Sequence, residues 1–273
     1  EGRALLIRPV LALEGMGMLS YLTANSIPMH YGQGIVSVSG DESINKAHFA
    51  KYTDDWYPID GTGTSLELDC LAVSYGFVSR NQLSQLFQLE HDICPTSGLK
   101  PQVNIWQQSS QENIYIAGDS VGILGGEGAM VEGRLAALSI AQNRKILPPE
   151  VVNKHAGTYF TLLHKVKRFR AGFDRIGRRR EGLLSLLKPN TIVCRCENVP
   201  RSAIDDVIGQ GVKDITSLKM RTRVGMGDCQ GKTCNSYCQD RLGYELKSTD
   251  IGHIKPRFPL DPIPFSALFD GVQ

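Results

Sequence analysis

The sequence has 273 residues, 41% of them hydrophobic, so the chain is long enough to bury one large core or two to three smaller ones. Its 30 basic and 28 acidic residues leave a formal net charge of +2, which gives no overall field favouring nucleic acid or an anionic membrane. No apolar run approaches the roughly 20 residues that span a bilayer, and the first residues lack the pattern of a signal peptide. We expect a globular cytoplasmic chain without a transmembrane segment, either free or peripheral to the inner membrane.

The first part of the chain is expected to mix helix and strand. A helix is predicted around Met16 to Ala24, ahead of the turn at Ser26-Ile27-Pro28. Apolar and small polar residues then alternate over residues 35–39, which is the pattern of a strand, and further strands are predicted at 47–52 and 65–73. This order predicts a meander of hairpins beside a crossover helix.

A second unit resembles a strand-loop-helix of the nucleotide-binding kind. The apolar strand Ile114–Ala117 leads into the turn Gly118-Asp119, a glycine-rich loop and a helix from about Glu127 to Gln142. Residues 153–187 then have a helical and increasingly basic pattern. The tail from Lys255 contains four prolines, which favour an extended segment.

Five of the seven cysteines fall between residues 194 and 238. Thiols stay reduced in the cytoplasm, so this clustering favours a metal site over a disulfide framework. Cys194 and Cys196 form a C-x-C pair, and Cys229 and Cys234 form a second pair downstream. Thiolates bind iron-sulfur clusters and zinc alike, but a C-x-C pair is less typical of zinc. A 2Fe-2S cluster is therefore favoured, with zinc or buried metal-free cysteines as alternatives.

Short helices are predicted around the cysteines. Residues 200–208 and 214–221 form two of them, and Cys229 and Cys234 open a third. Helix N-termini present free backbone N–H groups and partial positive charge, which stabilise an anionic cluster. Cys238 lies one turn beyond Cys234 and is expected to pack in the core, with replacement of a ligand as the alternative.

Residues 193–199, together with residues 225–231 and Cys234, resemble the bacterioferritin-associated-ferredoxin-like (BFD-like) 2Fe-2S domain. The resemblance implies that the cluster ligands are the four cysteines at matching positions, which are Cys194, Cys196, Cys229 and Cys234.

Residues 113–119 resemble the second flavin-contact motif of two-dinucleotide-domain flavoproteins. Gly118 permits close backbone approach, and the Asp119 carboxylate can accept a hydrogen bond from a ribityl hydroxyl of the flavin. In the following helix start, Gly126 and Gly128 would keep side chains away from the cofactor. A Gly-Asp turn alone is ordinary, but the adjoining glycine-rich helix start favours the flavin interpretation.

Residues 71–78 resemble the strand and turn that return from the middle, nicotinamide-type domain to the flavin domain. The G-x-G-x-x-G fingerprint of a first Rossmann unit is absent, so that unit would have to lie upstream. We therefore predict an N-terminally incomplete fragment of the α/β class. It would hold part of a Rossmann-like, two-dinucleotide-binding-domain flavoprotein followed by a small helical BFD-like 2Fe-2S domain.

The predicted division runs linearly along the chain. It consists of the later part of a nicotinamide-type middle domain at 1–95, the C-terminal part of an FAD-binding domain at 96–145, a basic helical bridge at 146–190, the 2Fe-2S domain at 191–247 and a proline-rich tail at 248–273.

This order of motifs resembles the larger, cluster-bearing subunit of opine oxidase and hydrogen cyanide synthase, and related proline or hydroxyproline dehydrogenases. The resemblance implies a component of a heteromeric FAD-dependent oxidoreductase that works on CH–NH donors, with FAD in the complete protein. It also implies a partner flavoprotein subunit of the D-amino-acid-oxidase kind, with a small ferredoxin-like subunit or another electron acceptor.

No catalytic residue is assigned, because the six histidines are scattered, and the fragment alone is expected to be inactive. The basic stretch from Lys165 to Arg180 is a solvated helix face or a docking site for an acidic partner, and no nucleic-acid partner is expected. Two other functions remain open, a zinc-bound interaction module and a cluster-based redox sensor.

Overall fold

The computed structural model describes residues 8–94, 98–248 and 250–266. The chain forms two compact units, each assembled from several segments. The first combines Glu1–Gln33, Ala72–Asn81 and Leu89–Arg179, and the second combines Gly34–Leu71, Gln82–Gln88 and Arg180–Gln273. The domain boundary expected between residues 95 and 96 lies outside the described residues.

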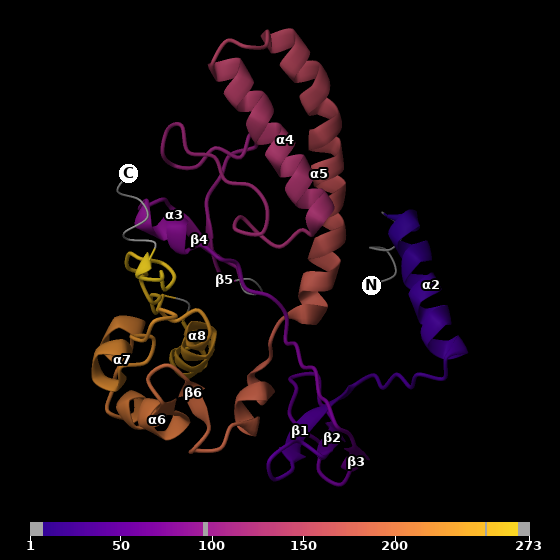
Figure 1. Ribbon diagram of the computed structural model, residues 1–273, viewed down its shortest axis with the longest axis vertical. Helices are drawn as coiled ribbons and strands as arrows, with labels where there is room; N and C mark the ends of the chain where they lie inside the picture. The colour runs from indigo at the N-terminus through magenta and orange to yellow at the C-terminus, as the bar shows by residue number, and fades with distance from the viewer. Residues whose placement is uncertain (1–7, 95–97, 249, 267–273) are drawn as a thin grey trace. The chain divides into compact units, whose positions relative to one another are not determined.

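The first unit is dominated by a hairpin of two long helices, α4 (Gly126–Asn143) and α5 (Pro149–Gly177), which run side by side (Figure 1). Pro149 begins α5 at a position where a missing N–H costs no hydrogen bond. The Trp106 and Phe160 rings meet edge to face with centroids 5.0 Å apart. The buried residues between the helices are Val131, Leu135, Ala156 and Leu163.

The same unit contains helix α2 (Pro9–Ala24) and the antiparallel strands β4 (His91–Cys94) and β5 (Gly98–Pro101). The predicted helices at 16–24 and 127–142 are confirmed, but α2 begins seven residues earlier than predicted, whereas α4 extends by one residue at each end. Over the described ranges, no helix is both long and apolar enough to cross a membrane.

The second unit begins with a three-stranded sheet in the order β1 (Gln33–Ser39), β2 (Lys46–Lys51) and β3 (Thr64–Glu67) (Figure 1). The strands lie in the sheet in the same order as in the chain, as predicted, and β2 and β3 are antiparallel. The third strand ends at Glu67, well before the expected Val73. Helix α3 (Gln82–Leu86) also belongs to this unit.

A short 3-10 helix, η1 (Glu181–Leu186), joins this sheet to the cysteine-bearing module. The Gly182 N–H donates to the Asp55 carbonyl at 2.9 Å, and a Cβ at Gly182 would lie 2.2 Å from the Trp56 backbone. Only glycine allows this approach. The helical stretch predicted over 153–187 is therefore divided between α5 and η1.

The module itself contains the antiparallel strands β6 (Ile192–Cys194) and β7 (Val199–Pro200) and three helices, α6 (Arg201–Gly209), α7 (Ile215–Thr222) and α8 (Cys234–Leu246). Asp214 caps α7, because its carboxylate accepts the Ser217 N–H at 2.8 Å, which also lowers the pKa of Asp214. The buried core includes Ile204, Ile215, Leu218, Val224, Cys238 and Leu242.

Three predicted details are corrected by the structure. The predicted strand at Ile114–Ala117 is not formed. This segment makes only an isolated antiparallel bridge between Tyr115 and Gln108, with hydrogen bonds to residues 107 and 109. Residues 71–78 have no strand structure. The pairings of β2 with β3, β4 with β5 and β6 with β7 are all antiparallel. The third helix of the module begins at Cys234, with Cys229 in the preceding turn.

The core of the module provides a test of its packing. Leu218 of α7 is 0% exposed, whereas Met220 of the same helix is 71% exposed. We expect Leu218→Ala to lower the free energy of unfolding by about 2–5 kcal/mol, because the truncation leaves a cavity in the core and removes the packing contacts of the leucine side chain. Met220→Ala should change it by less than about 0.5 kcal/mol. Denaturant unfolding followed by circular dichroism measures both, and equal effects would contradict the described core.

Candidate metal and cofactor site

The first cysteine pair lies where β6 turns back into β7. Cys194 is the last residue of β6 and is 2% exposed, while Cys196 lies on the intervening turn and is exposed. Asn198 closes this turn with a positive φ of 51°, a conformation that asparagine tolerates well. The two thiols therefore present one buried and one solvent-facing sulfur.

The second pair encloses the loop between α7 and α8. Cys229 is half-buried in a turn, and Cys234 is the first residue of α8 and is 2% exposed. The Asp228 carboxylate accepts the Cys229 N–H at 2.8 Å, and the Gln230 N–H donates to the Gly227 carbonyl at 2.9 Å. These contacts define the conformation of the loop.

The electrostatic surroundings of the four thiols differ. Burial alone would raise the pKa of Cys229, but hydrogen bonds from the Cys196 thiol and from three backbone N–H groups lower it. A hydrogen bond to the Asp228 carboxylate raises the pKa of Cys196 to about 11. Burial and neighbouring cysteines raise the pKa of Cys234. A cationic metal centre supplies the charge that deprotonates such buried thiols.

The thiols meet in two pairs drawn from distant segments. Cys229 lies near enough to Cys196, and Cys234 near enough to Cys194, for the neighbouring thiol to shift its pKa. In the parts of the chain that the structure describes, no three His, Cys, Asp or Glu side chains already converge as a metal site would require. Cys238 is 0% exposed and lies near Cys194 in the core, in agreement with a packing role.

Gly227 makes room for the exposed pair. A Cβ at this position would lie 2.2 Å from the Cys196 Cβ and 3.4 Å from its Sγ. Because backbone and a ligand candidate approach so closely, any side chain here would displace Cys196. Thiolate sulfurs are soft donors, and the space that Gly227 leaves beside Cys196 fits a small thiolate-bound cluster.

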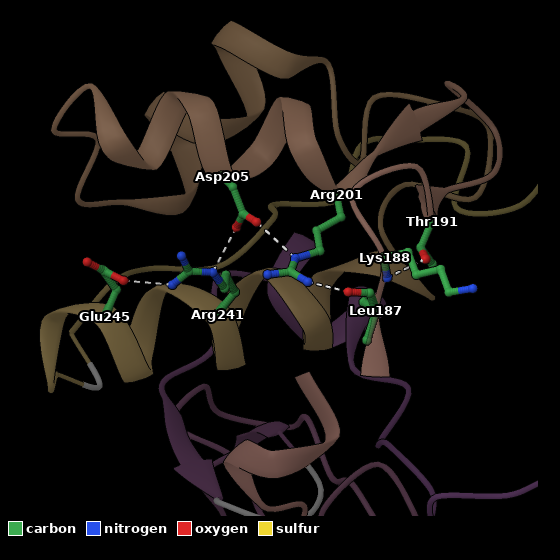
Figure 2. A network of polar contacts seen from close by, with 7 residues as sticks. All are labelled: Leu187, Lys188, Thr191, Arg201, Asp205, Arg241 and Glu245. Carbon is green, nitrogen blue, oxygen red and sulfur yellow. Dashed lines mark hydrogen bonds and ion pairs between the residues drawn. The ribbon is translucent and has the colours of Figure 1, made fainter. Parts of the chain in front are cut away.

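A polar network fastens the two cysteine-bearing segments together (Figure 2). Asp205 of α6 accepts hydrogen bonds from Arg201 and from Arg241 of α8, each at 2.9 Å. Arg241 also donates to Glu245 at 2.8 Å, and Arg201 donates to the Leu187 carbonyl just before β6. The network thus links α8, which begins at Cys234, to the segment that enters β6.

The first unit holds the predicted flavin-contact residues. Gly118 has a φ of 84°, and its N–H donates to the Glu132 carboxylate at 2.9 Å. Glu132 is 1% exposed, and burial raises its pKa, partly offset by the Gly118 N–H and by Lys167. This contact fastens the Gly118-Asp119 turn to α4.

The two helix-start glycines have different surroundings. A Cβ at Gly128 would lie 2.5 Å from the Leu124 Cβ and 3.4 Å from Val166 of α5, so this position needs glycine for packing. A Cβ at Gly126 would meet nothing within 4 Å, so that position is open.

Two cavities adjoin this turn. Asp119 lines one of about 400 Å³, together with aromatic residues of α5. The other has a volume of about 620 Å³ and is lined by Glu132 and Lys167. The two share Phe77, Ile123, Leu124 and Arg170 as lining residues. Their sizes are in the range of small-molecule sites, roughly 300–1,000 Å³.

Sequence reasoning missed two of these features. The spacing of Arg201 and Asp205, i and i+4 on a helix, was a usable signal for an ion pair, but no local signal joins Arg241 to Asp205. Likewise, nothing in the local pattern shows that Glu132 reaches back to Gly118.

Residues 192–243 match the BFD-like [2Fe-2S] binding domain, which makes this module an iron-sulfur domain. Over 267 residues the chain is 46% identical to hydrogen cyanide synthase subunit HcnB of Pseudomonas aeruginosa, a match that covers 98% of this chain. The chain spans 58% of the length of that subunit.

One further relative and one solved structure are similar to this chain. An opine oxidase subunit of Agrobacterium tumefaciens is 30% identical over 164 residues, which is 59% of this chain and 33% of that protein. The crystal structure of L-proline dehydrogenase from P. horikoshii superposes with a TM-score of 0.66 at 17% identity, covering 92% of this chain and 47% of that one, and shows the fold. The sequence matches confirm the predicted resemblance and the 2Fe-2S domain.

The network of Figure 2 gives a second prediction. Asp205→Asn replaces the carboxylate between two guanidinium groups that are about one quarter exposed. We expect the free energy of unfolding to fall by about 1–3 kcal/mol, because both charge-assisted hydrogen bonds are weakened. Asp206→Asn, an exposed neighbour, is the matched control and should have little effect. Equal midpoints of denaturation for the two variants would show that the network does not stabilise the module.

Proposed function

We propose that this chain is the cluster-bearing part of the larger subunit of a heteromeric FAD-dependent oxidoreductase, and that it relays electrons. The observation that carries the proposal is that Cys194 and Cys234, one from each cysteine-bearing segment, share a buried core within a BFD-like 2Fe-2S domain. The relatives support it, since two of them are named as subunits, one of a synthase and the other of an oxidase.

The proposed cluster ligands are Cys194, Cys196, Cys229 and Cys234. Cys194 and Cys234 lie in the same buried core, and the thiols of Cys196 and Cys229 shift each other's pKa. Three backbone N–H groups around Cys229 stabilise negative charge there. When bound, the cluster supplies one-electron transfer, which couples flavin chemistry to an acceptor.

The burial of the four thiols gives this relay a direction. Cys194 and Cys234 are each 2% exposed, whereas Cys196 is exposed on its turn. A partner can therefore approach the sulfurs from the side of Cys196 and the half-buried Cys229. We assign this edge to electron exchange with the partner.

The flavin contacts are proposed at Gly118, Asp119, Gly126 and Gly128. Asp119 lines a cavity next to the turn that Glu132 holds, and the open surroundings of Gly126 leave the helix N-terminus accessible. Gly128 contributes through helix packing. In the complete protein, the Asp119 carboxylate would orient FAD by accepting a hydrogen bond from a ribityl hydroxyl.

The remaining assignments extend this proposal. Proline and opines carry a carbon bonded to an amine nitrogen, which supports a CH–NH donor for the complex. A D-amino-acid-oxidase-like flavoprotein subunit would oxidise that donor, and a small ferredoxin-like subunit or another acceptor would receive the electrons. The linear domain boundaries are part of the proposal. A cytoplasmic location is also proposed, because clustered thiols stay reduced there. The chain spans 58% of the length of its relative in Pseudomonas aeruginosa, so the activity of the whole protein is part of this proposal.

Metal analysis tests the cluster directly. The anaerobically purified chain should contain iron and acid-labile sulfide in near-equal amounts and absorb visible light. Cys194→Ser and Cys229→Ser should each abolish that absorbance, because a thiolate ligand is lost. Cys70→Ser, an exposed cysteine outside the module, is the control and should retain it. Zinc without sulfide would replace the relay by a zinc-bound module, and unchanged spectra in both ligand variants would refute the ligand set.

Flavin titration of the complete protein tests the other site. Asp119→Ala should weaken FAD binding by roughly tenfold without unfolding, because one hydrogen bond to a charged group is removed. Glu112→Ala, an exposed acidic neighbour in the same unit, should bind FAD normally. If Asp119→Ala retained wild-type affinity, the assignment of this residue would be wrong.

A further inference from the structure

The segment that follows α8 returns to the cysteine loop. The matched 2Fe-2S domain ends at residue 243, yet Ile251 and Ile254 belong to the buried core of the module, with 4% and 5% exposure. The Ile215 N–H donates to the Ile251 carbonyl at 2.9 Å. These contacts fix the start of the tail on the module.

Ile254 lies against two glycines that flank Cys229. A Cβ at Gly225 would lie 2.3 Å from the Ile254 Cδ1, and a Cβ at Gly231 would lie 2.8 Å from the same atom. Both glycines have positive φ, 74° and 81°, so their conformation and their contact with the tail both require glycine. The isoleucine side chain therefore closes over the backbone on both sides of the cysteine.

Polar contacts continue this closure along the loop. The Gln230 side-chain amide donates to the Pro259 carbonyl at 2.6 Å and accepts the Arg257 N–H. Lys232 donates to the Leu260 carbonyl at 2.7 Å and pairs with Asp261. At the start of α8, the Asn235 side chain accepts the Ile254 N–H at 3.2 Å.

We propose that residues 251–261 form a strap that positions the Cys229–Cys234 loop for cluster binding. The loop residues that contact the tail lie within residues 225–235, around Cys229 and Cys234, and every partner in the tail lies beyond the matched domain. A loop with several glycines has high conformational freedom, and fixing it from outside lowers the entropy that must be lost when both thiolates bind. The inference rests on the proposed cluster ligands, but the strap itself is a property of the metal-free chain.

Two variants of the full chain separate the apolar and polar halves of the strap. Ile254→Ala removes the contact with both glycines, and Gln230→Ala removes two hydrogen bonds to the tail without touching the core. Ile263→Ala, an exposed tail residue, and Gln210→Ala, an exposed residue at the end of α6, are the matched controls. Ile254→Val removes only the Cδ1 methyl that lies nearest to both glycines and keeps the Cγ2 methyl beside them, so its effect should be intermediate between wild type and Ile254→Ala.

Hydrogen exchange of the metal-free chain is the first readout. Amides of residues 225–235 should exchange about tenfold faster in both strap variants, which corresponds to ~1.4 kcal/mol of lost closure. Residues of α6 should exchange at the wild-type rate. The second readout is iron release from the loaded chain to a chelator, which should also accelerate about tenfold, the same ~1.4 kcal/mol.

The outcomes distinguish this inference from the proposed function. A chain that never binds iron and sulfide would refute the cluster, while hydrogen exchange would still decide whether the strap holds the loop. Wild-type exchange in both strap variants would overturn the strap even if the cluster forms. If Ile254→Ala loses its circular dichroism signal, Gln230→Ala decides, since its side chain lies outside the buried core.

Discussion

The cysteine-bearing module depends on one constraint, which is that two thiol pairs far apart in the sequence must be brought to one place. Burial of apolar side chains provides the force: Ile204, Leu218 and Leu242 from three helices are each 0% exposed and pack in the same core as Cys194 and Cys234. The site is thus an extension of the core, with two of its sulfurs packed among apolar residues.

Apolar burial is not directional, and the orientation of the helices comes from polar contacts. Asp205 holds Arg201 and Arg241 and so fixes α6 relative to α8 (Figure 2). Loss of the Asp205 carboxylate would destabilise the module, because the guanidinium groups of Arg201 and Arg241 would then face each other without a negative charge between them. The tail adds a second restraint on the loop itself, where α8 begins. Together they restrict the freedom of a segment rich in glycine.

In the first unit, the same division applies between packing and polar restraint. The α4–α5 hairpin supplies the apolar surface, and Glu132 fastens the Gly118-Asp119 turn to it. Since Glu132 is 1% exposed, its carboxylate has lost most of its water and depends on the Gly118 N–H. The turn on which the flavin proposal rests is therefore held in place by Glu132, a residue of the helix that follows the turn.

The sequence by itself determined the cysteine spacing, the helices around it, the helix that follows the Gly-Asp turn and the order of the first three strands. These features depend on local signals, such as the capping carboxylate of Asp214, that act over a few residues. Only the tertiary structure decided the antiparallel pairing of residues 114–116, the reach of Asp205 to Arg241 and the return of Ile254 to the glycines beside Cys229. These contacts join segments that are distant in the chain, and their partners follow from how the whole core packs.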